Sequence, residues 1–169
     1  MPWVDQVRSA YAYNQWANDR LLAAAAKLGD EDLVRERVGS KGSIAADFAH
    51  IVATQQGWFS LLAGEERPPR WEPPQEDVIS TLRQHFDASH ERLRTWTSRV
   101  SEADLDRRIT TTYQGKEYAW QTWQVLFHLA NHGTQHRAEV GIVLLELGAS
   151  PGDLDAIDFF DLLNAAAPS

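Results

Sequence analysis

The sequence predicts an all-α protein, a four-helix bundle with one small hairpin-like excursion before its last long helix. Four long segments carry apolar residues at helical spacing and contain no proline. Residues typical of strands are concentrated in one short segment that precedes the fourth helical segment. Amphipathic helices must bury their apolar stripes, and a bundle buries all four together. The expected helices span residues 3–28, 43–64, 75–100 and 120–148.

The first two helices have clear ends in the sequence. Residues 3–28 contain no glycine or proline, finish in an alanine-rich run and stop at Gly29. A charged loop flanked by glycines follows. Ser43 is a suitable N-cap for the second helix, because its hydroxyl can accept from a free backbone N–H, and Gly64 closes that helix.

The connections around the third helix differ in character. Residues 65–77, EERPPRWEPPQED, hold four of the seven prolines and therefore predict a rigid, extended connector. It is too short to be a linker between freely moving domains, so residues 1–169 are expected to form a single domain. After the third helix, Ser101 and Asp104 have the spacing of a capping signal for a short helical turn.

The last part of the chain contains the excursion, the fourth helix and a short tail. Residues 107–119 concentrate Thr, Ile and Tyr around a Gln-Gly turn, which favours a short hairpin. The fourth helix is expected to start at Trp120 and to end at Gly148. Beyond a Pro-Gly break, the tail predicts a short amphipathic segment with an apolar side formed by Ile157, Phe160 and Leu163.

Two histidines lie on the apolar stripe of the fourth helix, WQTWQVLFHLANHGTQHRAEVGIVLLELG. At about 100° per residue, His132 and His136 fall on the same side as Leu129 and Val140. Imidazoles one turn apart point the same way and can share one metal ion. The alternative is a pair of core histidines with hydrogen-bond partners, but a buried pair at this spacing favours metal.

A metal site needs at least one more ligand, which a bundle supplies from a facing helix. His50 lies at the edge of the second helix's stripe and is the candidate. Asp47 lies one turn away and either orients His50 or is a surface carboxylate. His128 lies at the edge of its stripe, and His85 and His90 lie off the stripe of the third helix, so we expect both of these to be solvated.

Other polar and aromatic residues fall where a pocket would be. Asn14 and Asn18 lie one turn apart on the apolar stripe of the first helix and either bond a neighbouring backbone or line a central pocket. Trp58, on the inward side beyond His50, is expected to wall the same cavity. Glu139 lies about 20–40° from the histidine pair. Four roles are open for Glu139: a fourth metal ligand, a hydrogen-bond acceptor that orients an imidazole, a general base, or a surface carboxylate.

Three motifs together resemble the DinB-like (YfiT-like) metal-binding family, which is related to bacillithiol- and mycothiol-dependent transferases. They are YNQWANDRLL in the first helix, FAHIVATQQGWF in the second and HLANHGTQHRAEV in the fourth. The resemblance implies a right-handed bundle with up-down-down-up topology, often found as a homodimer. It also implies a divalent metal held by His50, His132 and His136, with His128 outside the ligand set.

Composition limits the classes of function. The net charge of −8, spread over scattered acidic residues, gives little support to nucleic-acid binding. No stretch resembles a membrane span or a signal peptide, so a cytoplasmic location is expected. The absence of cysteine excludes disulfides, a thiolate nucleophile and cysteine ligands. The partner expected is a small-molecule substrate.

The chemistry expected is that of an open three-histidine site. Such a site, with zinc or nickel as the expected metals, leaves coordination positions for a substrate. The first hypothesis is a metal-dependent S-transferase that uses a low-molecular-weight thiol as co-substrate, as the resemblance implies. The alternatives are a metal-dependent hydrolase and a non-enzymatic metal-binding stress-response protein. An open pocket beside the ion favours an enzyme, whereas closure of the site by Glu139 favours a structural ion.

Overall fold

The computed structural model describes residues 2–38, 41–69 and 71–166. Within these residues the chain forms seven helices and a two-stranded antiparallel sheet. Helices therefore dominate the fold, as the sequence predicts. The elements in order are α1 (Trp3–Ala25), α2 (Asp30–Val34), α3 (Ile44–Ala63), α4 (Val78–Arg99), α5 (Glu102–Asp106), β1 (Arg108–Tyr113), β2 (Lys116–Gln121), α6 (Thr122–Glu146) and α7 (Ala156–Ala166).

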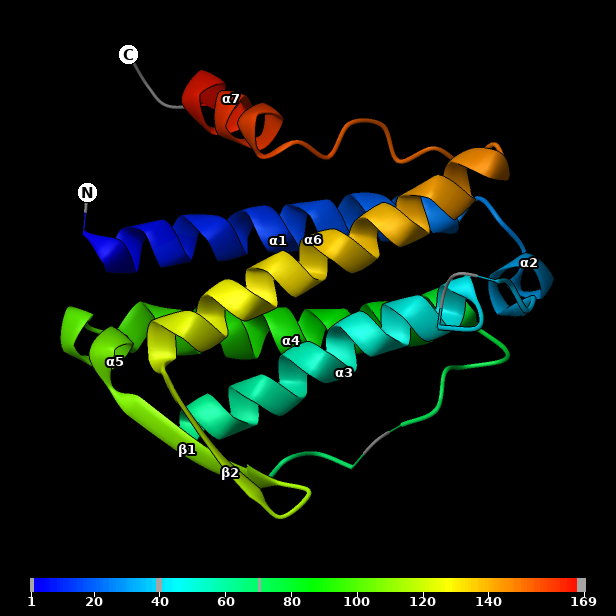
Figure 1. Ribbon diagram of the computed structural model, residues 1–169. Coiled ribbons are helices and arrows are strands. Elements are labelled where there is room, and N and C mark those ends of the chain that lie inside the picture. Colours follow the sequence, from blue (N-terminus) through cyan, green and yellow to red (C-terminus); the bar gives the residue numbers. More distant parts are fainter. Residues whose placement is uncertain (1, 39–40, 70, 167–169) are drawn as a thin grey trace.

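Four long helices, α1, α3, α4 and α6, form the body of the molecule (Figure 1). Both α6 and α4 pack against α3 and against α1, so the four enclose a common interior. In Figure 1, α1 and α6 run from left to right, and α3 and α4 run from right to left. The handedness of the bundle stays a prediction. Across the described ranges, no helix combines the length and the apolar character needed to cross a membrane.

The interior is divided along its length into two apolar clusters with a polar layer between them. One cluster, near α2, includes Phe48 and Phe86, and the other, near the hairpin, includes Phe59 and Leu129. Side chains from all four long helices form the buried polar layer: Asn14, Asn18, Gln55, Ser89, His90, His136 and Arg137. Buried polar groups require partners, so this layer is where a functional site is expected.

The capping signals read from the sequence operate in the structure. The Ser43 hydroxyl accepts from the backbone N–H of Ala46, and Gly64 ends α3 in the left-handed conformation at φ 70°. Ser101 and Asp104 form a capping box at the start of α5. The first helix ends at Ala25, three residues before its expected end, since residues 26–28 form turns instead.

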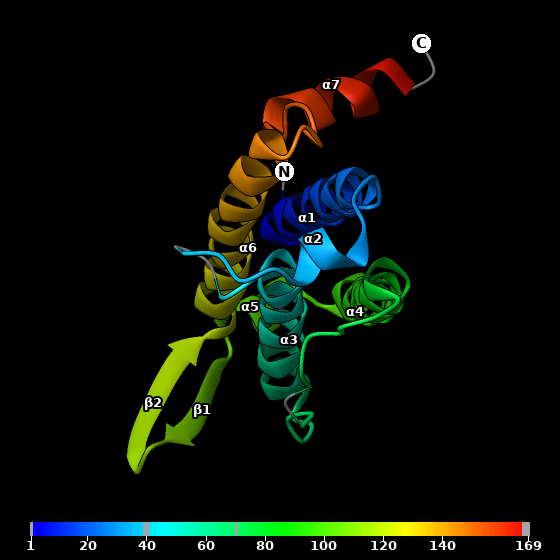
Figure 2. The ribbon, with the colours of Figure 1, turned by 90° about the vertical axis from the view of Figure 1, so that its right-hand side faces the viewer.

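The hairpin confirms the excursion and shifts the start of the last helix. Gln114 and Gly115 both have positive φ, 49° and 75°, as a tight two-residue hairpin turn requires. The strand pairing extends beyond the expected range and includes Trp120, which pairs with Ile109. The last long helix therefore begins at Thr122 and not at Trp120. Figure 2 shows the hairpin and α7 extending from opposite sides of the bundle.

The tail forms the short helix α7, but the predicted apolar side is not its buried side. Phe159 is buried, with its ring 6.1 Å from that of Tyr13 and 5.7 Å from that of Trp16 on α1. The three residues of the predicted apolar side are exposed instead: Ile157 at 64%, Phe160 at 36% and Leu163 at 50%. The prediction was wrong because α7 lies at the edge of the bundle and is anchored to α1 mainly by one ring.

Candidate metal centre

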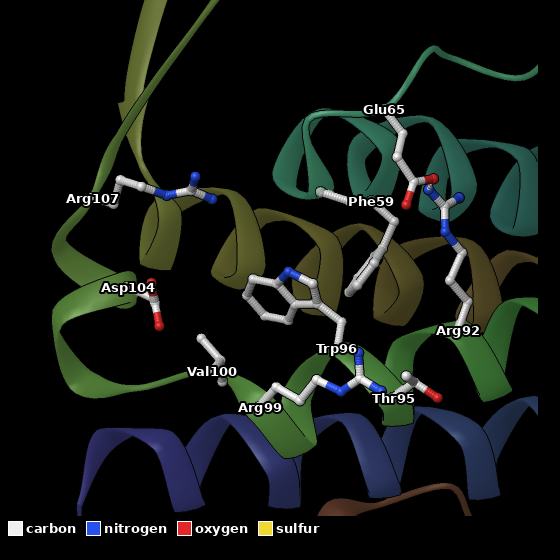
Figure 3. A pocket seen from close by; sticks show the side chains of 10 residues that line it. Phe59, Glu65, Arg92, Thr95, Trp96, Arg99, Val100, Asp104 and Arg107 are labelled. Atoms are coloured by element: carbon white, nitrogen blue, oxygen red, sulfur yellow. Dashed lines mark hydrogen bonds and ion pairs between the residues drawn. The ribbon is translucent and has the colours of Figure 1, made fainter.

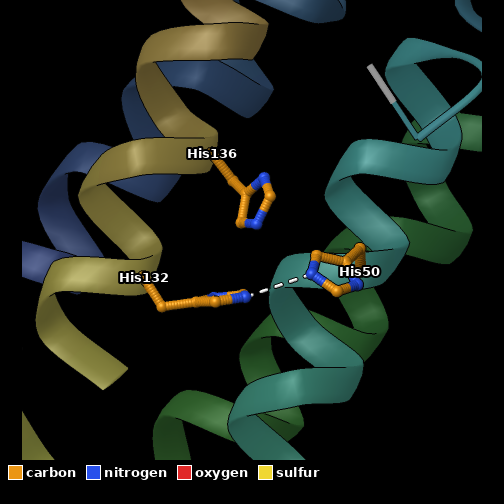
Figure 4. A group of neighbouring side chains, drawn as sticks. All are labelled: His50, His132 and His136. Atoms are coloured by element: carbon orange, nitrogen blue, oxygen red, sulfur yellow. Dashed lines mark hydrogen bonds between the residues drawn. The ribbon is translucent and has the colours of Figure 1, made fainter. Parts of the chain in front are cut away.

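Three histidines from α3 and α6 converge on one point (Figure 4). His50, His132 and His136 each offer one ring nitrogen, and these three nitrogens lie within 4.8 Å of one another. The Nε2 atoms of His50 and His132 are 3.1 Å apart. The ring of His136 lies 4.6 Å from that of His50 and 4.4 Å from that of His132. Three nitrogens this close form a group that could hold a metal ion.

The packing of α3 against α6 brings the triad together. His132 and His136 are one turn apart and point toward α3, where His50 faces them. His136 belongs to the buried polar layer at 4% exposure, whereas His50 and His132 are half-buried. The group is therefore closed toward the interior and open on one side.

The protonation of the triad suits a cation. Burial, together with the neighbouring His136 and His50, lowers the pKa of His132 to about 4. His132 is therefore neutral at neutral pH, and a neutral imidazole is the form that binds metal. The 3.1 Å contact between two Nε2 atoms requires one of them to be a donor, and an ion would replace this contact. The donor set consequently fits a divalent metal.

Glu139 supports His136 from the side away from the other two histidines. Its carboxylate is 2.6 Å from Nδ1 of His136 and also accepts from Gln135. Burial raises the pKa of Glu139, but the hydrogen bonds from His136 and Gln135 lower it more, so it lies below its ordinary value. Ionised Glu139 thus favours the tautomer with the proton on Nδ1, which leaves Nε2 of His136 free for a metal.

Asp47 is buried beside this pair. Its Oδ1 accepts a hydrogen bond of 2.9 Å from the backbone N–H of Lys41, and one of its oxygens lies within 4.8 Å of ligand atoms of His136 and Glu139. Its side chain is only 1% exposed, so the interpretation as a surface carboxylate was wrong. Asp47 adds negative charge behind the triad, which favours a bound cation.

A cleft of about 730 Å³ opens beside His50. One wall is α3, and the other is formed by residues 67–69 and 71–73 of the proline-rich connector. Both Arg67 and Trp71 line the cleft, and Lys41 lies at one end. The position of the connector over α3 was not predicted from the sequence, although Gly57 inside a helix was a signal. A Cβ at Gly57 would lie 2.8 Å from Nε of Arg67, whose side chain crosses α3 at that point.

A family model for the DinB family matches residues 4–164. The chain belongs to the DinB family. A search of curated proteins finds no match. Among solved structures, the chain is similar to a conserved protein from Enterococcus faecalis, with a TM-score of 0.65 and 11% identity over 85% of this chain and 96% of that one. At this identity the likeness concerns the fold alone.

In this DinB-family protein the amides of the first helix belong to the polar layer. Both are buried, and Asn18 bonds Nε2 of His90 and Nη1 of Arg137, each at 3.3 Å. Asn14 lies against Gly133: a Cβ added at Gly133 would be 3.3 Å from Oδ1 of Asn14. Arg137 is itself 2% exposed and also donates to Thr134. The Asn18 amide therefore links α1 to α6 and α4, whereas Asn14 only packs against α6, and a role of either amide in ligand binding stays a prediction.

The prediction that His90 is solvated was wrong, because its side chain is only 2% exposed. Helix α4, which carries His90, packs against both α3 and α1, so it buries a second face that a single apolar stripe does not reveal. His90 lies on this second face and meets Asn18 there. His85 is half-buried, with its ring stacked 4.0 Å from that of Trp71.

The tryptophan that lines the cleft is Trp71, while Trp58 packs on the hairpin side of the triad. The Trp58 ring lies 5.3 Å from that of Trp120 and 5.4 Å from that of His128. The His128 ring in turn lies 5.6 Å from that of His132. Trp58 is thus linked to the metal centre through His128, and its predicted role as a cavity wall is not established by these contacts.

Proposed function

We propose that this DinB-family protein is a metal-dependent S-transferase that uses a low-molecular-weight thiol. The observation that supports the proposal most strongly is the convergence of three imidazoles, one of which, His50, also lines a 730 Å³ cleft. A structural ion needs a closed coordination sphere, whereas a catalytic ion needs open positions and room for a substrate. The triad is open on the side of half-buried His50 and His132, and the cleft beside His50 offers the room.

In this proposal, Nε2 atoms of His50, His132 and His136 hold a divalent ion, with zinc and nickel as the best candidates. Such an ion lowers the pKa of a thiol that binds at an open position, which makes a thiolate available at neutral pH. Glu139 acts as a positioning residue, since its bond to Nδ1 fixes the ring of His136. Because this bond holds the Glu139 carboxylate on the far side of the His136 ring, Glu139 is not expected to occupy an open coordination position of the ion.

The charge of the cleft supports a small-molecule substrate with acidic groups. Lys41 and Arg67 contribute two positive charges to the lining, against the single carboxylate of Glu72. Thr54 and Gln56 of α3 add polar side chains, and the Trp71 ring adds an apolar surface. An apolar wall with a few polar groups near an ion is the usual composition of a small-molecule site.

A thiol-transfer assay tests this function. The metal-loaded protein would be incubated with an electrophilic substrate, such as 1-chloro-2,4-dinitrobenzene, together with one thiol at a time. The thiols to compare are bacillithiol, mycothiol, glutathione and cysteine. The proposal requires metal-dependent conjugation with at least one thiol, lost in His132→Ala and kept in His85→Ala. Metal-dependent hydrolysis of an ester panel, without conjugation, would instead favour a hydrolase. Metal binding without either activity would favour a non-enzymatic stress-response protein.

We also propose that the protein is a homodimer formed through the exposed face of α6. This face carries Trp123, Phe127, Ile142 and Leu145 at 37%, 69%, 61% and 62% exposure, with exposed Thr134 at its centre. Trp123 and Leu145 each lie 11 residues from Thr134, and Phe127 and Ile142 lie seven before and eight after it. An antiparallel pair of α6 helices crossing near Thr134 would therefore place Phe127 of one copy close to Ile142 of the other. Such self-complementarity is what a two-fold interface requires.

Sedimentation analysis of the purified protein tests the dimer. Phe127→Asp would place a charge in the proposed interface and should produce a monomer. The control is Ile157→Asp on α7, where an isoleucine of similar exposure, 64%, lies outside the symmetric face. A wild-type monomer, or a Phe127→Asp variant that remains dimeric, would contradict the proposal.

A further inference from the structure

A second pocket, of about 370 Å³, lies at the hairpin end of the bundle (Figure 3). The last turns of α3 and α4 form two of its sides, and α5 with Arg107 forms a third. No residue that lines it also lines the cleft at the metal centre. Along α3, His50 and Ala63 are 13 residues apart, which corresponds to about 20 Å of helix. The pocket is therefore a separate site.

The floor of this pocket is aromatic and apolar. The rings of Phe59 and Trp96 meet edge to face at 5.6 Å, and Val100 extends the surface toward α5. Phe59 and Val100 are buried, whereas Trp96 is half-buried and lies at the centre of the pocket in Figure 3. A half-exposed indole in a concave site offers a flat surface on which an apolar ring can stack.

The rim is positively charged although the protein as a whole is acidic. Three arginines and two carboxylates line the pocket, which leaves a surplus of one positive charge in a chain of net charge −8. Arg92 pairs with Glu65 and also donates to the Ser60 hydroxyl. These two opposite charges already pair with each other, so the surplus comes from Arg99 and Arg107 against the single carboxylate of Asp104.

These two arginines have N–H groups to spare, and their guanidinium groups lie on different sides of Trp96 in Figure 3. Arg107 donates from one Nη to the carbonyl of Leu62 at 2.9 Å, which holds its guanidinium over the end of α3. The side chain of Arg99 makes no hydrogen bond or ion pair with the part of the chain that the structure describes. The carboxylate of Asp104 is occupied by the backbone N–H and hydroxyl of Ser101. Guanidinium groups with free N–H donors beside an aromatic floor favour an anion with an apolar body.

We propose that this pocket binds a small organic carboxylate. The flat apolar part of the ligand lies on Trp96, and its carboxylate accepts hydrogen bonds from Arg99. The volume of about 370 Å³ admits one bicyclic aromatic acid. The proposal is independent of the activity at the metal centre, because the two sites share no lining residue.

The test uses 1-naphthoate as the probe and the full-length, metal-loaded protein. Calorimetric titration measures affinity, and the indole N–H signal of Trp96 in a ¹H–¹⁵N spectrum reports the location. We expect saturable binding at one site with a shift of the Trp96 signal. The neutral 1-naphthamide should bind about tenfold more weakly, as should 1-naphthoate to Arg99→Gln, since a charged hydrogen bond is lost. Arg94→Gln, on the same helix but outside this pocket, should bind as wild type does.

Two further measurements keep the test decisive. Arg99 is exposed, so Arg99→Gln should fold normally, and its melting temperature checks this. His132→Ala removes the other anion-attracting centre and should leave naphthoate binding unchanged. The proposal would be overturned by equal affinity for the acid and the amide, by full affinity in Arg99→Gln, or by loss of binding in His132→Ala.

Discussion

Burial of His90 makes the stability of this fold depend on pH. Its side chain is 2% exposed, and its Nε2 lies 3.3 Å from the amide nitrogen of Asn18. An amide N–H is a donor, so this contact requires an unprotonated Nε2. Burial lowers the pKa of His90 to about 4; Asp87 raises it in part, while Arg94 and Arg137 lower it. The folded protein therefore holds His90 neutral well below pH 6.

The sign and size of the effect follow from proton binding in the two states. A histidine in the unfolded chain has a pKa of about 6.5. Between pH 6.5 and pH 4, the unfolded state binds a proton that the folded state does not, so stability falls as the pH falls. From pH 7 to pH 5 this difference amounts to roughly 2 kcal/mol for a pKa of about 4 in the folded state. Total stabilities are typically about 5–15 kcal/mol, so the effect is measurable.

Urea unfolding of the metal-free protein at pH 7 and pH 5 measures this contribution. His90→Gln keeps an acceptor for Asn18 and has no proton to gain, so its stability should fall by about 2 kcal/mol less than that of wild type. Other titrating groups are shared by both proteins and cancel in the comparison. The control is His85→Gln on the same helix, a half-exposed position that should retain the wild-type fall. The reasoning would be refuted if His90→Gln lost as much stability as wild type.

Three further substitutions test the polar layer and the support of the triad. Gly133→Ala would place a Cβ 2.7 Å from Nη1 of buried Arg137 and should lower the free energy of unfolding in urea by about 1–3 kcal/mol. The control Gly141→Ala, whose Cβ would have no atom within 4 Å, should not lower it. Asn18→Leu leaves His90 and Arg137 without this partner and should also cost about 1–3 kcal/mol; unchanged stability with weaker substrate binding would show a pocket residue instead. Glu139→Gln should weaken metal affinity by about 10–100-fold in chelator competition, and unchanged affinity would refute its positioning role.

The sequence predicted the helices well because each buries a periodic apolar stripe and ends at a recognisable cap. Ser43, Gly64 and the Ser101–Asp104 pair mark ends that the structure confirms. The failures are at faces that carry no such stripe. His90 is buried on a second face of α4, where its partner is an amide of another helix. Phe159, not the predicted stripe, anchors α7, because that helix contacts α1 at the edge of the bundle.

Two members of the triad were predictable because they are one turn apart on one apolar stripe, whereas His50 was a candidate at the edge of another stripe that the family resemblance supported. The roles of other residues depend on long-range placement. The hydrogen bond between Glu139 and Nδ1 of His136 depends on side-chain direction, which left several roles open in the sequence. Arg67 and Trp71 reach the cleft because an extended connector turns back along α3. Proline content predicts that such a segment is stiff but not where it lies.

Metal content of the purified protein is the most direct test of the metal centre. Elemental analysis after dialysis against each candidate ion should find one divalent ion per chain in wild type. His50→Ala, His132→Ala and His136→Ala should each lose it, because two imidazoles do not hold the ion well. His85→Ala and His128→Ala should retain it, since neither belongs to the convergent group. A wild-type protein that binds no ion, or His132→Ala with full metal content, would contradict the account.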